Sequence, residues 1–276
     1  MVWLPLALFA LVTWSVQRVV TKVALLRWTT ARFYRWNAIV SLLVYLPYAV
    51  VVPPRADALV PAIGLSLLMA LTFGVTTEAT RRGPIGVVAP LTATSPALTV
   101  LLAVALLGER SGPLVIAGVG CAIIAAILLA ARPAEVAIGG WLALALASLT
   151  LQGIGAFIAK IVVTDGGPTT LLLTSVIVQL AVGVVIARGV PLDVGSSLRG
   201  MPLIVTLTLA AAAVATIGYL SALSVGPASV IVPLVATSPA LGGLLGIIAL
   251  KERVDRRQAV GIAVGVLGII VLARPT

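Results

Sequence analysis

The first apolar segment of the chain carries three side chains that could contact an anion together. Trp14, Arg18 and Lys22 are spaced by four residues, so in a helix they stack along one face. Arg18 and Lys22 would form a cationic wall for a carboxylate or phosphate, and Trp14 would pack on the apolar part of the ligand. An equally good interpretation of Arg18 is that it reaches lipid headgroups from the end of the helix. Lys22 recurs as Lys160, which favours a cavity-facing position over a structural one.

Glu78 is an acidic residue at the edge of another apolar segment. It precedes Arg81 by three residues and Arg82 by four, which favours an ion pair within one helix. The alternative is a buried carboxylate that carries protons, or one that pairs with Arg18 or Lys22. Protons would then be the coupling ion.

Two uncharged polar residues are predicted to line a cavity in the second half of the chain. Gln152 occupies the position that Trp14 has in the first half, and Tyr219 lies in the segment that matches that of Glu78. For Gln179 we favour a hydrogen bond between helices without any ligand.

The pairs Glu109-Arg110 and Glu252-Arg253 end two matching apolar segments. Their predicted role is structural, because a carboxylate there can accept hydrogen bonds from the first amides of the next helix or pair across the loop. No substrate contact is expected at these pairs.

The composition argues against an enzyme. The chain has no histidine, which removes the commonest general base and metal ligand, and Cys121 is its single cysteine. No Gly-x-Ser-x-Gly elbow and no metal-ligand spacing occur. We therefore expect no catalytic residue, no cofactor and no metal site.

The segments that must position these residues are duplicated. Residues 84–110 and 227–253 are two copies of one stretch, and eight of nine residues match between 90–98 and 233–241. Each copy has two prolines six residues apart, and a proline removes a backbone hydrogen bond and bends a helix. We expect these bends to face an internal cavity and to act in gating. The prolines are Pro90 and Pro96 in the first copy and Pro233 and Pro239 in the second.

The composition indicates a polytopic membrane protein. Of 276 residues, 61% are hydrophobic and 9% charged, and the mean hydropathy is +1.23. The net charge of +10 comes from basic residues between apolar runs, as in membrane proteins, and no aromatic–basic pattern for nucleic acid occurs. Ten predicted spans follow: 2–22, 34–52, 58–78, 84–107, 113–131, 138–160, 170–188, 201–222, 227–250 and 258–273.

The second five spans repeat the first five, which predicts two five-helix repeats at 1–133 and 134–276 within one membrane domain. An odd number of spans per repeat places the second copy in the membrane with inverted topology, a plan typical of secondary transporters. Thirteen basic residues fall on the side reached after the first span and four on the other. This bias predicts both termini outside the cytoplasm, in a multi-pass protein of the plasma (inner) membrane.

The chain resembles the EamA-type transporters of the drug/metabolite transporter superfamily over nearly its whole length. The resemblance rests on Trp14 and Lys22, on Gly83-Pro84, and on the repeated Pro…Ser-Pro…Glu-Arg pattern. It implies an all-α protein of ten transmembrane helices that exports or exchanges small metabolites, often amino acids, by alternating access. Members usually have cytoplasmic termini and a basic loop between spans two and three, and this chain departs on both counts.

The leading hypothesis is a secondary transporter of a small anionic or zwitterionic, amino-acid-like metabolite, working through a central cavity between the repeats. One alternative is proton-coupled efflux of lipophilic cations through Glu78, although the basic first helix would repel such cargo. Another is a lipid-linked flippase component or membrane scaffold. The expected partners are a small-molecule substrate and the lipid bilayer, with no nucleic acid. Glycine patterns such as Gly242…Gly246 suit packing within the chain, so a monomer or weak dimer is expected.

Overall fold

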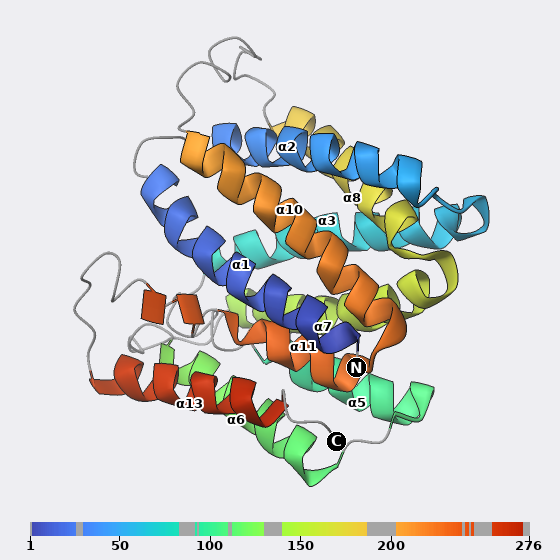
Figure 1. Cartoon of the computed structure of the whole chain (residues 1–276). Coiled ribbons are helices and arrows are strands. Elements are labelled where there is room, and N and C mark those ends of the chain that lie inside the picture. The colour runs from blue at the N-terminus through green and yellow to red at the C-terminus, as the bar shows by residue number, and fades with distance from the viewer. Residues whose placement is uncertain are drawn as a thin grey trace.

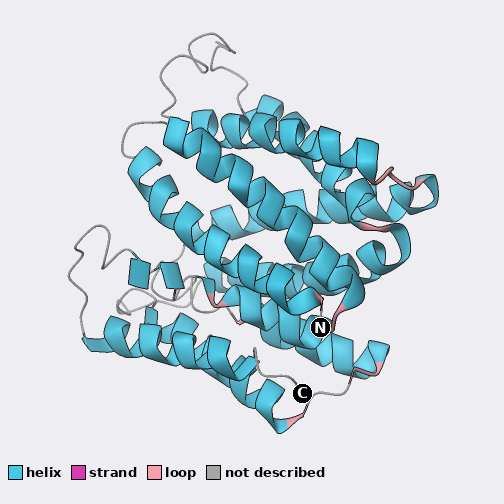
Figure 2. Cartoon of the chain, viewed as in Figure 1, coloured by secondary structure: helices cyan, strands magenta, loops and turns pink. Residues whose placement is uncertain are grey.

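The computed structural model of the chain is helical wherever regular structure is described (Figures 1 and 2). It describes residues 2–25, 30–82, 92, 94–109, 112–129, 140–186, 203–238, 241–242, 244–245 and 256–272. The elements are α1 (Trp3–Leu25), α2 (Thr30–Val51), η1 (Ala56–Ala58), α3 (Leu59–Arg82), α5 (Ser95–Leu107), α6 (Pro113–Leu129), α7 (Gly140–Gly166), α8 (Pro168–Ile186), α10 (Leu203–Val225), α11 (Ala228–Ala236) and α13 (Arg256–Leu272). The predicted all-α class is confirmed.

Four stretches of the described chain are long and apolar enough to cross a membrane. They are Trp3–Thr21, Ala56–Thr76, Gly140–Gly166 and Leu203–Val225. Five shorter apolar helices accompany them: Arg35–Val51, Ser95–Leu107, Pro113–Ala125, Pro168–Val182 and Ala259–Leu272. The count of ten spans stays a prediction.

The two halves of the chain pack by exchanging helices. α1 of the first half packs against α10 of the second, and α7 of the second half packs against α3 of the first. The remaining helices pair with their counterparts: α2 with α8, α5 with α11, and α6 with α13. Figure 1 shows α1 beside α10, and α2 and α8 together at one side of the bundle. The halves therefore interlock, and their interface runs through the middle of the molecule.

Small residues allow the helices to approach closely. A Cβ on Gly153 of α7 would lie 2.8 Å from the Leu98 Cβ and 2.9 Å from the Ser95 carbonyl oxygen of α5. Two residues further along α7, a Cβ on Gly155 would lie 2.7 Å from the Met69 Cε of α3, the flexible end of that side chain. The obstacle at Gly153 includes a backbone oxygen, so a methyl group has no space there and glycine lets α7 touch α5.

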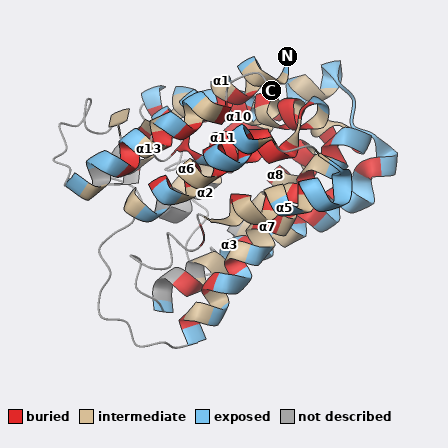
Figure 3. Ribbon diagram, turned by 90° about the horizontal axis from the view of Figure 1, so that it is seen from below, coloured by how far each residue is buried: buried red, intermediate tan, exposed pale blue. Residues whose placement is uncertain are grey.

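Burial follows the membrane pattern expected from composition. Buried residues gather where helices face one another, and the outer surfaces are largely exposed (Figure 3). Large apolar side chains such as Leu43, Ile116 and Leu203 are among the most exposed on those outer surfaces. An apolar exterior of this extent is suited to lipid.

Within the predicted span 84–107, the structure describes Thr92 as helical and then a helix from Ser95 to Leu107. Thr94 is the N-cap of α5, and Pro96 lies in its first turn. A proline in the first turn has no intrahelical hydrogen bond to lose, so this place suits the start of α5, and the role of Pro96 in a bend stays a prediction. Pro233 lies inside α11, as expected. Pro90 and Pro239 lie outside the described residues.

Candidate functional site

A pocket of about 270 Å³ lies between α3 and α8, halfway along both helices. Its lining combines three polar side chains with apolar ones. The lining residues are Ser66, Met69, Ala70, Phe73, Ser175, Val178 and Gln179.

The pocket is on the inner side of both helices. Leu67 and Leu71 are exposed on the outer face of α3, and Met69 and Phe73 each follow one of them by two residues. Two residues correspond to about 200° of rotation in an α-helix, so Met69 and Phe73 lie on the opposite face. Their exposure of 39% and 48% therefore reports space inside the bundle.

The same relation holds on α8. Ile177 is 60% exposed, and Ser175 and Gln179 lie two residues before and after it. Both polar side chains are thus turned about 160–200° away from the outer face.

The hydroxyl groups of the pocket are engaged, whereas the amide of Gln179 is not. The Ser66 hydroxyl lies 2.7 Å from the Ala62 carbonyl oxygen and 3.0 Å from the Thr174 hydroxyl. The Ser175 hydroxyl donates to the Leu172 carbonyl at 2.9 Å. Within the described ranges, the Gln179 side chain has no hydrogen-bond partner. The expected hydrogen bond between helices at this residue is therefore not found there.

Gln152 belongs to α7 and forms a polar cluster with Ser148 of its own helix and Thr76 of α3. Its amide nitrogen is 2.9 Å from the Ser148 hydroxyl and 3.5 Å from that of Thr76, and these two hydroxyls are 2.6 Å apart. Thr76 is three residues after Phe73, so this polar cluster adjoins the pocket face of α3. Gln152 was predicted to line a cavity, and the structure places it at the α3–α7 contact.

Trp14 and Tyr219 meet where α1 crosses α10. Their ring centroids are 5.3 Å apart with planes inclined by 54°, a favourable tilted arrangement. The Trp14 indole nitrogen donates to the Ala212 carbonyl at 3.4 Å. Two residues nominated separately from the sequence are thus in contact.

The repeat relates this aromatic pair to the polar cluster of Gln152. Gln152 follows Trp14 by 138 residues, the same interval that separates Lys160 from Lys22. Tyr219 follows Thr76 by 143 residues, the interval between the repeated Gly-Pro pairs that open the duplicated stretches. Trp14–Tyr219 and Gln152–Thr76 therefore occupy equivalent positions of the two halves, one aromatic and one hydrogen-bonding.

Lys160 is engaged by backbone groups. Its ammonium donates to the carbonyl oxygens of Leu223 at 2.7 Å and Gly226 at 2.8 Å, at the C-terminal end of α10. A cation there satisfies carbonyls that have no helical partner and interacts favourably with the helix dipole. The described contacts of Lys160 thus serve the fold.

Glu109 caps a helix that is distant in sequence. Its two carboxylate oxygens accept hydrogen bonds from the backbone amides of Ala228 at 2.9 Å and Ser229 at 2.8 Å. These amides open α11, so the carboxylate satisfies free donors at a helix N-terminus. The capping role agrees with the expectation, but the capped helix is α11 and not the next one, α6.

The other nominated charges lie elsewhere or outside the description. Glu78 forms an ion pair with Arg82 one turn along α3, which is the favoured interpretation of its spacing. Arg18 and Lys22 belong to α1, four and eight residues after Trp14, and their side chains lie outside the described part.

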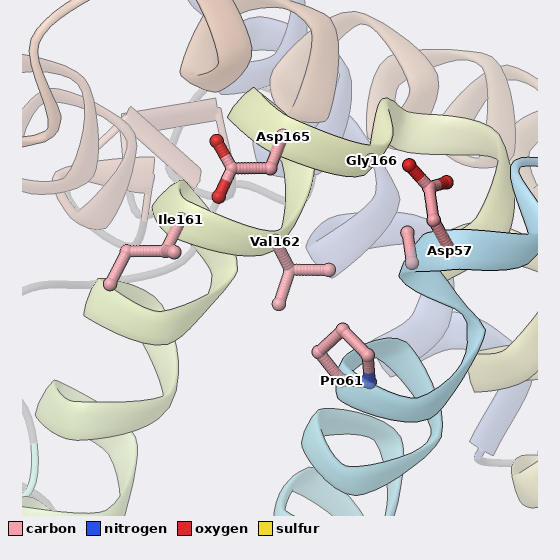
Figure 4. Close-up of a pocket in the computed structure, with 7 residues that line it drawn as sticks. Asp57, Pro61, Ile161, Val162, Asp165 and Gly166 are labelled. Atoms are coloured by element: carbon pink, nitrogen blue, oxygen red, sulfur yellow. The ribbon is translucent and has the colours of Figure 1, made fainter.

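A second pocket of about 210 Å³ opens at the end of the bundle, where Asp57 and Asp165 flank it (Figure 4). Asp57 is paired with Arg55 at 2.7 Å, and both side chains are more than half exposed. Exposed ion pairs of this kind contribute little to the stability of the fold. No group of three or more metal-ligating side chains occurs in the searched, described residues.

Comparison with known proteins identifies the family. The model of the EamA-like transporter family matches twice, over residues 1–131 and 139–274. No curated protein shows significant sequence similarity to the chain. One solved structure, titled only as the crystal structure of a protein, superposes with a TM-score of 0.76 over 98% of this chain and 95% of that one, at 16% identity. That likeness extends to the fold alone. Since the family model covers nearly the whole chain in two copies, the protein belongs to the EamA-like transporter family and is a multi-pass membrane transporter of the drug/metabolite transporter superfamily.

Proposed function

We propose that the protein is a secondary transporter that exports or exchanges a small zwitterionic or anionic, amino-acid-like metabolite by alternating access. The observation that carries this proposal is the pocket between α3 and α8, which opens on the inner faces of both helices at mid-length. A site at that depth, between interlocked repeats, is what alternating access requires, because either end of the bundle can then expose it.

The lining of the pocket favours a substrate with one apolar and one polar end. Met69 and Phe73 offer a polarisable apolar surface on α3, and Gln179 and Ser175 offer hydrogen-bonding groups on α8. Within the described residues the Gln179 amide has no protein partner, so its donor and acceptor are available to a polar ligand. A substrate carboxylate or ammonium group would bind there.

The charge of the substrate is argued from the first helix. Arg18 and Lys22 follow Trp14 at intervals of four on α1, and Trp14 is on the side of α1 that meets α10. Their spacing would set both positive charges on that face, and from it we infer a preference for a carboxylate. Efflux of lipophilic cations through Glu78 receives less support, because its carboxylate is paired with Arg82 and the described residues that line the pocket between α3 and α8 include no acidic one.

The experiment compares spent medium from cells that express the wild type, Gln179→Leu or Leu71→Ala at equal membrane levels, by untargeted metabolite profiling. We expect an amino-acid-like carboxylate to accumulate outside with the wild type and to fall about tenfold with Gln179→Leu, since a lost hydrogen bond to a charged group costs about 1.5–3 kcal/mol. Leu71→Ala changes only the outer face of α3, so it should match the wild type. Equal efflux from the wild type and Gln179→Leu, or none from the wild type, would contradict the proposal.

A further inference from the structure

Two charged side chains hold the turn between α10 and α11 from its two sides. Lys160 binds the carbonyl end of α10, and Glu109 binds the amide end of α11. The opposite charges of Glu109 and Lys160 also attract each other, which offsets part of the cost of removing the ammonium from water. The pair therefore secures one short turn through both of its helix ends.

The turn is also enclosed by side chains. A Cβ on Gly226 would lie 2.6 Å from the Trp3 Cγ of α1 and 2.7 Å from the Ile231 Cδ1 of α11. The Thr164 hydroxyl of α7 approaches the Ser224 carbonyl at 3.4 Å. The backbone at Gly226 is thus in close contact with both halves of the chain.

These contacts cross between the repeats at one end of the bundle. Glu109 follows α5 and Trp3 begins α1, both in the first half, whereas the turn that they contact belongs to the second half. Figure 1 places the N-terminus beside this turn. A transporter with a site between its repeats must separate them at one end at a time, so contacts of this kind hold that end closed.

We propose that Glu109, supported by Lys160, is a gating latch: its carboxylate closes one end of the transport pathway by capping α11, and release of that cap is the step that opens this end. The inference rests on the proposed transport function. The carboxylate suits the role because it joins the repeats through two hydrogen bonds, and these can be exchanged for water at the end of a helix without unfolding it.

The test measures access to the inner pocket from each face of the membrane. Ala70→Cys places a reporter thiol in the pocket wall, on a Cys121→Ala background. Membrane vesicles of both orientations receive a membrane-impermeant maleimide, with Glu109 intact or changed to Gln. Asp165→Asn is the matched control, because it also removes one negative charge but leaves the cap of α11 intact. Asp165 is exposed at the end of α7, five residues after Lys160.

Glu109→Gln should raise the labelling rate about tenfold from one face, because the charge-assisted cap is lost and the closed state loses population. Glu109→Asp keeps the charge on a shorter side chain, so its labelling rate should lie between those of Glu109→Gln and the wild type. The latch is overturned if labelling is unchanged or rises only as much as with Asp165→Asn. It is also overturned if labelling rises equally from both faces, as a loosened fold would give. Metabolite efflux by the wild type judges the transport proposal separately, since labelling needs no substrate.

Discussion

The charged side chain of Lys160 within the membrane binds backbone groups of the protein itself. Lys160 lies in a long apolar helix, where an unpaired ammonium would be costly. Two carbonyl oxygens at the end of α10 accept hydrogen bonds from it, and Glu109 supplies a counter-charge. The conspicuous cation of the second repeat thus stabilises a helix end.

Replacing Lys160 by Ala should destabilise the protein, because the carbonyl groups of Leu223 and Gly226 lose their charged donor. The free energy of unfolding is expected to fall by about 1–3 kcal/mol. Thermal unfolding of the detergent-solubilised protein measures it as a lower Tm. Lys160→Arg keeps the charge and should recover part of the loss, whereas an unchanged Tm for Lys160→Ala would argue for a ligand-binding role in its place.

At the scale of helices, close packing at glycine decides which elements meet. α7 contacts α5 through Gly153, where the Thr99 hydroxyl also donates to the Gly153 carbonyl at 3.0 Å. The obstacle to a larger residue includes the Ser95 backbone oxygen, which cannot move without moving α5. This contact joins the two repeats beside the polar cluster of Gln152.

Gly153→Ala should therefore push α5 and α7 apart, at a cost of about 1–3 kcal/mol typical of overpacking. Gly64→Ala is the control, because nothing lies within 4 Å of its added Cβ on α3, and alanine favours a helix. Both variants are compared with the wild type by their Tm and by their expression level. Equal stability of both would show that the α5–α7 contact yields more easily than its geometry implies.

At the scale of the whole molecule, the exchange of helices joins the two repeats into one unit. α1 needs α10, and α3 needs α7, to cover their inner faces. Neither half can therefore bury its own helices as it does in the complete chain. The latch and the inner pocket both depend on this interlocking, because each lies where helices of different halves meet.

The orientation of the whole molecule in the membrane remains a prediction from charge. The bias of thirteen basic residues against four places both termini outside the cytoplasm. Fusions of alkaline phosphatase and of a fluorescent protein to the C-terminus test this. Phosphatase activity without fluorescence is expected, and the reverse would agree with the cytoplasmic termini usual in similar transporters.

The sequence by itself determined the helical membrane class and the duplicated layout, because run length, composition and repetition are properties of neighbouring residues. It also nominated Trp14 and Tyr219, which do meet, and favoured the ion pair of Glu78, which spacing within one helix decides. Gln179 was expected to form a hydrogen bond between helices without a ligand, because the sequence does not show that a pocket adjoins it.

Only the tertiary structure decided which helices exchange partners and what the charges contact. Glu109 was expected to cap the next helix or to pair across the loop, and it caps α11, more than a hundred residues later. Sequence distance carries no information about such a contact, since it depends on how helix surfaces fit. The repeat shows which positions are equivalent, and close packing at a few glycines fixes which of them touch.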